Sequence, residues 1–483
     1  MKQWLETRRV LVSVLALGFF AMAARPVTDP DVWWHLRTGE LIASTHAFVR
    51  VDPYSFTRHG RPWVNHEWLS DLLVYGLYRL AGWGGLIAAA AAITSLALML
   101  VFVRSPGRPY FAALALLWGA YAAAPTWGVR PHTISLLLAS VFLLLLDRSE
   151  QNPRLLWLTV PLTLLWVNLH AEFALGIVLI ALFLAGEALE ITSGQRRWES
   201  SSRKRLQSLG FALIACLAVV PLNPNGSMMY RYPVSTLLSP AMQRYIAEWS
   251  SPNFHDAKYL PFALMLCGIL FLLANLSYTP RLRDLLLLLV TAGGALQSVR
   301  HISVFILVAV PVISALMQAW WSEHGHRFAR TIPTTRRTLV FNAVVLASVV
   351  SFAAIRMHSV AVRQPQTESE SFPMGAVQFL LSARPPGPIL NHYNFGGYLI
   401  WRLQGQYPVY IDGRADLYGD DFLHQFARTY YVASDWQKPF EQWKIRTAVL
   451  PADAPVLSAL TLSGRWKEAY HDSQAVVVTR TLP

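Results

Sequence analysis

Long apolar segments alternate with short polar turns over most of this 483-residue chain. A helix needs about 20 apolar residues to cross a bilayer, and many of the segments approach that length. Several are shorter, so tilted or re-entrant helices are expected among them. The pattern is that of a polytopic α-helical membrane protein. We predict about eleven spans, over residues 9–24, 83–103, 109–124, 131–147, 154–169, 172–190, 208–222, 259–278, 284–299, 301–321 and 337–355.

The first apolar segment permits two interpretations. The stretch "MKQWLETRRVLVSVLALGFFAMAARP" has the basic start, apolar middle and small-residue end of a cleavable secretory signal. Because ten further apolar segments follow it, we expect it to be retained as the first transmembrane helix. Cleavage is the alternative.

Charge is sparse and unevenly placed. Charged residues make up 14% of the chain, against about 25% in a typical soluble domain. Eighteen Lys and Arg lie in segments predicted to be cytoplasmic, and five lie in the short loops predicted to be outside. The positive-inside rule therefore places the N-terminus in the cytoplasm and the C-terminal tail outside. The net charge of +13 reflects this topology, so nucleic acid is not an expected partner.

Four regions are predicted: a first transmembrane helix (1–24), a first extracytoplasmic loop (25–82), a transmembrane helical body (83–355) and an extracytoplasmic α/β domain (356–483). Within the loop, "NHEWLSDLLVYGLYRLAGW" has the helical spacing of an amphipathic helix on the membrane surface. In the tail, helical and extended segments alternate, which is typical of a small α/β domain. Residues 387–393, 407–414, 446–453 and 473–480 read as extended, and residues 374–383, 421–431 and 435–445 as helical. Residues 363–373 read as a polar linker.

The unusual polar residues fall at one set of helix ends, those predicted to face outside. Carboxylates, imidazoles and guanidiniums at a membrane boundary are costly unless they are paired or used, so together they indicate a shared site. A single Arg or His at a helix end is more simply an interface anchor. The turns predicted to be cytoplasmic contain Arg, Lys and Ser, and no comparable cluster is expected there. The predicted outer set comprises Asp29, Asp31, His35, Arg37, His66, Glu67, Arg130, His132, Asn168, His170, Glu172, Asn223, Asn225, Tyr230, Arg231, Arg300 and His301.

These residue types suit a lipid-linked phosphosugar. Guanidinium groups match phosphate oxygens, and a carboxylate can act as general base on a hydroxyl group. Trp and Tyr rings can stack on sugar faces, and an apolar helical body can hold a lipid tail. The cysteines add no chemistry, because Cys216 and Cys267 both lie inside predicted spans.

The chain resembles the GT-C superfamily of membrane glycosyltransferases. The resemblance rests on an Asp directly after the first helix, a surface amphipathic helix, many spans and an outer C-terminal α/β domain. The chain is also similar to a group of bacterial polytopic membrane proteins that share "DxWWHLxxG", "HEWLS" and "DGRxDLYG"-like stretches. The resemblance implies an enzyme of the bacterial inner membrane that moves a sugar from a polyprenyl-phosphate-linked donor to an extracytoplasmic glycan, lipid or protein acceptor.

The resemblance also implies residue roles. The first-loop carboxylate would be the general base, which maps onto Asp31 or Asp29, with Asp31 favoured because aromatic residues and His35 follow it. A second group would bind the donor phosphate: Arg130, His132, Arg231, Arg300 and His301. A third would orient substrates: His35, Arg37, His66, Glu67, His170 and Glu172. Some superfamily members use a divalent metal ion, so a metal held by the His and Glu residues is an open alternative.

Other interpretations stay open at several positions. Asp29-Pro30-Asp31 can cap the following helix, and Trp33 and Trp34 can serve packing. Polar residues of the tail either line a strand-end ligand site or form turns and caps: Asn391, His392, Tyr393, Asn394, Asp412, Arg414 and Asp416. For the whole chain, a lipid-linked sugar transporter or flippase, an O-antigen-ligase-like enzyme and a non-enzymatic envelope assembly protein are the alternative functions.

Overall fold

The computed structural model describes residues 5–325 and 335–481, which divide into two compact units. The first, called the helical unit, contains residues up to Arg25, Ile87–Met229 and Ala247–Val360. The second, called the α/β unit, contains Pro26–Leu86, Tyr230–Ile246 and the described residues from Ala361 onward. The first loop and the tail, which are far apart in the sequence, thus belong to the same unit.

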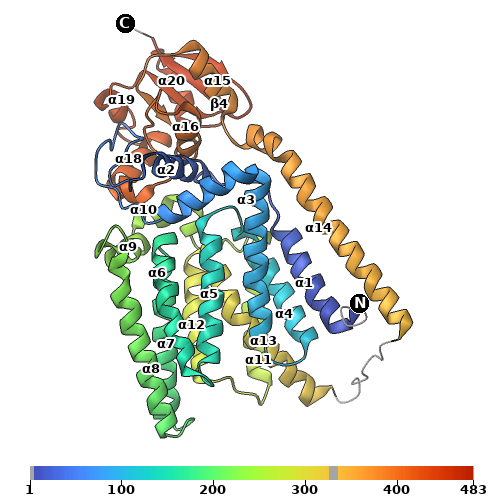
Figure 1. Ribbon diagram of the computed structural model, residues 1–483. Helices are drawn as coiled ribbons and strands as arrows, with labels where there is room; N and C mark the ends of the chain where they lie inside the picture. The colour runs from blue at the N-terminus through green and yellow to red at the C-terminus, as the bar shows by residue number, and fades with distance from the viewer. Residues whose placement is uncertain (1–4, 326–334, 482–483) are drawn as a thin grey trace. The chain divides into compact units, whose positions relative to one another are not determined.

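The helical unit is a bundle of apolar helices that run roughly parallel or antiparallel to one another (Figure 1). Small residues bring helices close, since a methyl group at Gly119 of α4 would overlap Val310 of α13. The helices are α1 (Thr7–Ala23), α4 (Pro109–Ala123), α5 (Pro131–Arg148), α6 (Thr159–Leu169), α7 (Phe173–Thr192), α8 (Ser200–Val219), α11 (Leu260–Asn275), α12 (Leu282–Gln297) and α13 (Ile302–His324).

Two long helices contain residues of both units: α3 (Trp68–Arg104) and α14 (Arg336–Ser371). Helical dihedral angles are interrupted in α3 at Gly82, with φ 57° and ψ −157°. This break separates the predicted amphipathic segment from the predicted span that begins at residue 83. The positive φ is one that glycine adopts without strain, which explains why the chain can change course there.

The predicted helical segments are confirmed as helices, and their number as membrane spans stays a prediction. Each of the eleven predicted segments lies in or largely overlaps helical structure. Within the described residues, seven helical segments are long and apolar enough to cross a membrane. They are Trp68–Arg104, Pro131–Arg148, Phe173–Thr192, Ser200–Leu222, Ala257–Asn275, Val299–His324 and Arg336–Ser371.

One expectation about the predicted cytoplasmic turns is wrong. A buried ion network joins the ends of α5, α7, α8 and α12, where no polar cluster was expected. Arg205 pairs with Glu187 at 3.0 Å, and Arg283 pairs with Glu150 at 2.6 Å. In the sequence these Arg and Glu residues look like charges that set the membrane topology. Their pairing depends on helices that are neighbours in space, which the sequence around each residue does not reveal.

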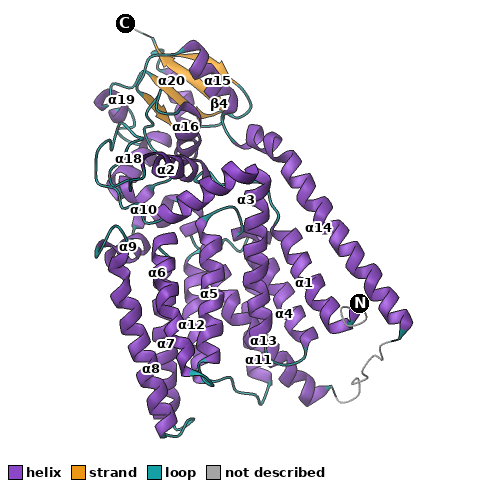
Figure 2. Cartoon of the chain, viewed as in Figure 1, coloured by secondary structure: helices purple, strands orange, loops and turns teal. Residues whose placement is uncertain are grey.

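The α/β unit is built on a four-stranded sheet with the order β1-β2-β4-β3 (Figure 2). β1 is parallel to β2, and the other neighbours are antiparallel. The strands are β1 (Ile389–Asn391), β2 (Thr447–Pro451), β3 (Trp466–His471) and β4 (Ala475–Arg480). The helices are α2 (Val32–Thr45), α9 (Met228–Leu237), α10 (Pro240–Tyr245), α15 (Met374–Ala383), α16 (Gly396–Leu403), α17 (Ala415–Tyr418), α18 (Asp420–Tyr430), α19 (Lys438–Gln442) and α20 (Pro455–Leu462).

The segment 407–414 was predicted as a strand and is not part of the sheet. The Asn391 side chain contacts its backbone, accepting from Tyr410 N at 2.8 Å and donating to Ile411 O at 2.7 Å. The first loop contacts it too: Phe56 N donates to Val409 O, and Val409 N donates to Tyr54 O. The segment therefore joins the first loop to the tail.

The predicted polar linker 363–373 is also wrong over most of its length, because α14 continues through it to Ser371. Tertiary contacts stabilise the helix there despite Pro365. The Gln364 amide exchanges hydrogen bonds with the Val27 backbone at 2.8 and 3.1 Å, and Glu368 accepts from Arg402 at 2.7 Å. In the segment 435–445 only α19 is helical, and β3 was not predicted.

A buried ion cluster ties the first loop to the "DGR" turn. Arg414 binds both oxygens of Asp412 at 2.7 Å, and its NH2 lies 2.8 Å from Asp52. All three side chains are almost completely buried. This geometry favours the structural interpretation of Asp412 and Arg414.

Arg414→Met is expected to lower the free energy of unfolding by about 3–5 kcal/mol, because two buried carboxylates would lose their shared cation. The midpoint of thermal unfolding of the purified protein in nanodiscs measures this. Arg428→Met is the matched control: its ion pair with Asp435 is exposed, so a loss under about 1 kcal/mol is expected. Equal effects of the two substitutions would contradict a structural role for the cluster.

Candidate functional site

Asp31 and Asp29 occupy one turn but have different contacts. Asp29 Oδ1 accepts a hydrogen bond from Asp31 N at 2.9 Å, so Asp29 organises the turn. Asp31 stands at the N-cap position of α2, yet its side chain makes no capping hydrogen bond. Instead, its carboxylate accepts from the Trp34 indole at 3.1 Å. The capping interpretation therefore does not account for the Asp31 side chain.

Two glycines of the tail lie against this turn, and a third brings two stretches of the tail together to form a close-fitting cradle. A methyl group at Gly413 would overlap the Asp31 carboxylate, and one at Gly397 would overlap the Pro30 carbonyl oxygen. Gly396 allows α16 to approach the Ile411 carbonyl in the same way. The "NFGG" and "DGR" stretches of the tail thus hold the predicted catalytic turn of the first loop.

His35 lies between two carboxylates. Its Nδ1 is 2.6 Å from Asp71 Oδ1, and its Nε2 is 3.4 Å from Glu67 Oε2. Burial alone would lower its pKa, but the hydrogen bond to Asp71 and the charges of Glu67, Asp71 and Asp31 outweigh burial and raise the pKa to about 9. His35 is therefore an imidazolium at neutral pH. Asp71 was missed in the sequence, because it sits at the start of an amphipathic helix where acidic residues are ordinary.

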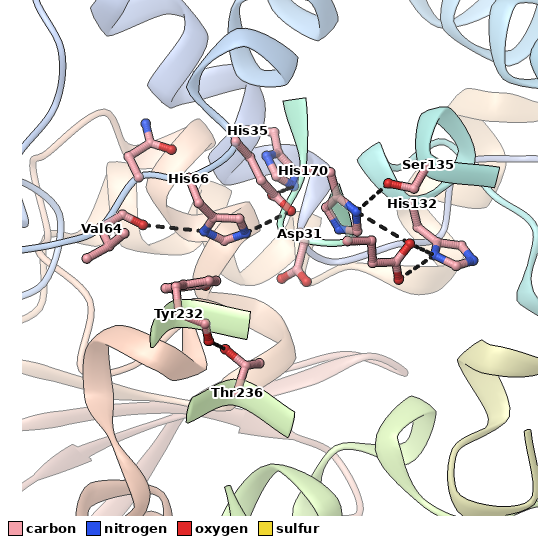
Figure 3. A network of polar contacts seen from close by, with 12 residues as sticks. Asp31, His35, Val64, His66, His132, Ser135, His170, Tyr232 and Thr236 are labelled. Atoms are coloured by element: carbon pink, nitrogen blue, oxygen red, sulfur yellow. Dashed lines mark hydrogen bonds and ion pairs between the residues drawn. The ribbon is translucent and has the colours of Figure 1, made fainter. Parts of the chain in front are cut away.

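Glu67 extends this network to His66, which Figure 3 shows with its contact to the Val64 carbonyl. His66 Nε2 is 3.1 Å from Glu67 Oε1, and its ring lies against Tyr232, with centroids 4.2 Å apart. Burial opposes protonation of His66, but Glu67 and then Asp416 raise its pKa. The first loop, the tail and α9 therefore contribute side chains to one polar network.

Trp33 and Trp34 of the first loop serve packing more than ligand contact. Trp33 is 1% exposed and packs edge-on against Trp83 and Tyr398 at 5.0 and 4.7 Å between ring centroids. Trp34 is 5% exposed and holds Asp31 through its indole nitrogen. A sugar-stacking role for Trp33 does not fit this burial.

A second cluster lies in the helical unit, where helix ends bring four predicted residues together. His132 Nδ1 contacts both Glu172 oxygens at 2.9 and 3.0 Å, and Arg300 NH2 lies 3.0 Å from Glu172. His170 Nδ1 is 3.5 Å from Glu172 and 2.7 Å from the Ser135 hydroxyl (Figure 3). Burial favours the neutral acid, but His132, His170 and Arg300 lower the pKa of Glu172 well below its usual value.

Glu248, which was not predicted, completes this cluster. Its carboxylate pairs with Arg130 through Oε2 and accepts from Arg300 NH1 at 3.4 Å through Oε1. Burial opposes its ionisation, but Arg300 and Arg130 prevail and lower its pKa to about 2. The only sequence signal was a single Glu in the loop 223–258. We call Arg130, His132, Glu172, Glu248 and Arg300 the Arg–Glu cluster.

The remaining predicted residues lie in varied places. His301 is close enough to the Arg–Glu cluster for the charges of Glu172 and Arg300 to act on it. Arg37 pairs with Glu40 on α2, and Arg231 is exposed on α9. The amides of Asn168 and Asn223 donate to the Leu164 and Val167 carbonyls, which is a structural role; in the tail, Tyr393 donates to Gly413 O.

The metal hypothesis is not tested by these contacts. Across residues 5–325 and 335–481, no group of three or more His, Cys, Asp or Glu side chains is arranged to hold a metal ion.

Comparisons with known proteins define the fold. No protein-family model and no curated protein matches the chain. The solved structure of the oligosaccharyltransferase AglB from Archaeoglobus fulgidus, in complex with an inhibitory peptide and a dolichol-phosphate, matches with a TM-score of 0.55 and 12% identity over 91% of this chain and 69% of AglB. ArnT from Cupriavidus metallidurans, bound to undecaprenyl phosphate, matches with a TM-score of 0.51 and 17% identity over 98% of both chains.

AglB and ArnT are GT-C glycosyltransferases, and this chain has their fold. The sequence-based resemblance is thereby confirmed at the level of fold. Together with the apolar helices, it identifies the chain as a membrane protein.

The His35 network predicts a pH dependence of stability. Because folding raises the pKa of His35 from about 6.5 to about 9, its stabilising effect is complete below about pH 6.5 and is lost as the pH rises through about 9. A shift of this size corresponds to about 3 kcal/mol. The thermal unfolding midpoint should therefore fall over this pH range, and His35→Gln should flatten the profile. An unchanged profile in the variant would exclude a protonated His35.

Proposed function

We propose that the protein is a GT-C-type glycosyltransferase that moves a sugar from a polyprenyl-phosphate donor to an extracytoplasmic acceptor. The observation that carries the proposal is the Asp31 carboxylate, which follows α1 in the chain and is held against Gly413 and the Trp34 indole without capping its helix. The fold shared with AglB, solved with dolichol-phosphate, and ArnT, solved with undecaprenyl phosphate, supports the donor class.

In the proposed reaction Asp31 is the general base. It takes the proton of the acceptor hydroxyl while that oxygen bonds to the anomeric carbon, and the bond from this carbon to the phosphate oxygen breaks with its electron pair leaving on the phosphate. The charge of Asp31 acts on the His35 imidazole, so the two side chains are close enough to act together in the proposed step. Glu67 and Asp71 hold the ring of His35, and His66 extends the network toward the tail.

The phosphate-binding role falls to residues of the Arg–Glu cluster. Arg130 and Arg300 would neutralise the charge that develops on the departing phosphate, usually the largest electrostatic contribution to such a step. His132 and His301 would assist as donors, with His170 and Glu172 fixing their positions. Arg37 and Arg231 would contact substrate only from outside these clusters, and a divalent ion held by the His and Glu residues is the alternative means of neutralising the phosphate.

The proposed location is the bacterial inner membrane, with the N-terminus in the cytoplasm and the α/β unit outside. The distribution of Lys and Arg supports this orientation. The acceptor is a glycan, lipid or protein on the outer side, and the tail residues near Asp31 would contribute to its recognition.

Asp31→Asn is expected to lower sugar transfer by ~10²-fold or more, because a general base is lost. Radiolabelled sugar transfer from a membrane pool of polyprenyl-phosphate sugars measures this, with expression checked in parallel. Asp29→Asn is the matched control, since Asn keeps the oxygen that binds Asp31 N and should retain most of the activity. The proposal would be contradicted if Asp29→Asn lost sugar transfer while Asp31→Asn retained it. It would also be contradicted if the wild-type protein moved the labelled lipid between leaflets without transferring the sugar.

Gly413→Ala is expected to lower transfer by at least ~10-fold, because the added methyl group displaces the Asp31 carboxylate from its position. Asp31 is a short side chain that can rotate away, so the unfolding midpoint should change little. Gly76→Ala, where nothing lies within 4 Å of the added atom, is the control. Transfer unaffected by Gly413→Ala would show that the cradle does not position the base.

A further inference from the structure

The Arg–Glu cluster is balanced in charge before any ligand is present. Arg130 and Arg300 supply two positive charges, and Glu172 and Glu248 supply two negative ones through the ion pairs between them. Both glutamates are held ionised by these cations. An anionic ligand that enters therefore adds negative charge to a group that is already neutral.

Glu248 stands where a ligand anion would otherwise bind. Its two carboxylate oxygens reach different guanidiniums, so one carboxylate bridges Arg130 and Arg300 as a phosphate group would. Its backbone is fixed, because Ser298 Oγ donates to Glu248 O at 2.9 Å. Trp249, the next residue, lies under the Arg300 guanidinium at 4.8 Å. Glu248 is thus a built part of the cluster.

One neighbouring polar atom is left without a protein partner. His132 is 4% exposed, and its Nε2 is buried without a hydrogen-bond partner while Nδ1 contacts Glu172. This nitrogen lies on a residue of the Arg–Glu cluster, so a ligand bound to the cluster can contact it while the Glu172 contact is kept.

We propose that Glu248 is a specificity-determining residue that makes the donor site select lipid carriers with a single phosphate over carriers with a pyrophosphate. This inference rests on the proposed function, which identifies the ligand as a polyprenyl-phosphate donor. It adds a limit on the negative charge of the group that links the sugar to the lipid. A pyrophosphate brings more negative charge than a single phosphate into a cluster whose Arg and Glu charges already cancel, and unbalanced charge in a partly buried site is costly. Glu248 sets this limit because its carboxylate neutralises one of the two positive charges of Arg130 and Arg300.

The test compares two lipids on purified protein in nanodiscs. Undecaprenyl phosphate and undecaprenyl pyrophosphate are titrated into wild type, Glu248→Gln and Glu248→Asp, and inorganic phosphate and pyrophosphate are titrated separately. Wild type is expected to bind undecaprenyl phosphate at least ~10-fold more tightly than the pyrophosphate. In Glu248→Gln the pyrophosphate should gain the most and the ratio should fall to about 3-fold or less. Glu248→Asp, which keeps the charge, should retain the wild-type preference.

Controls separate specificity from stability and from the transfer reaction. Glu199→Gln removes an exposed carboxylate and should leave both affinities unchanged. The unfolding midpoint identifies a variant that misfolds, and if Glu248→Gln does so, Glu248→Ala replaces it as the variant that lacks the charge. If wild type also binds inorganic phosphate more tightly than inorganic pyrophosphate, the protein distinguishes the carriers by their anionic group, as proposed. A preference that is seen only with the two lipids would overturn the proposal.

The outcomes also distinguish this proposal from the proposed function. Equal binding of both lipids by wild type, or a ratio that Glu248→Gln leaves unchanged, would overturn the role of Glu248 and leave sugar transfer standing if transfer is observed. If the protein shows the expected binding preference but transfers no sugar, the role of Glu248 in selecting the carrier would be supported. The proposed glycosyltransferase activity would then be excluded. Absence of binding by either lipid would overturn both.

Discussion

The surroundings of Asp31 depend on a steric constraint: three positions in the tail cannot carry a side chain. Gly396, Gly397 and Gly413 let backbone approach backbone and carboxylate more closely than any other residue would allow. The Asp31 carboxylate rests against the Gly413 backbone, and a base must be held close to its productive geometry. The glycines thus support the Asp31 turn through close backbone contact, a role that packed side chains have in other sites.

The two polar clusters have opposite arrangements of charge: carboxylates around an imidazole in one, and guanidiniums around a carboxylate in the other. In the α/β unit, Asp31, Glu67 and Asp71 surround His35, so the imidazole retains its proton. In the helical unit, Arg130 and Arg300 surround Glu248, so the carboxylate loses its proton. In both places side chains of opposite charge lie together, which lowers the cost of burying them. The first arrangement suits proton transfer and the second suits anion binding.

Periodicity in the sequence was enough to find the helices, because an apolar segment of helix length has few alternatives in a membrane. It was not enough for the segment 407–414, which alternates like a strand but has its backbone groups bound by Asn391 and the first loop. The residues of the site were recognisable by type, and Asp31 stood out by its place after the first helix. Glu248 and Asp71 did not, since an isolated acidic residue acquires meaning only from partners distant in sequence. The glycine cradle was equally hidden, because a glycine in a turn looks the same whether or not another chain segment rests on it.

The union of the first loop and the tail in one unit has a consequence for biogenesis. Asp31 is synthesised long before Gly396, Gly397 and Gly413. The turn that contains Asp31 therefore lacks these contacts until the ribosome has passed "DGR". A nascent chain that stops before "NFGG" carries Asp31 without the glycines against which its turn rests in the folded protein.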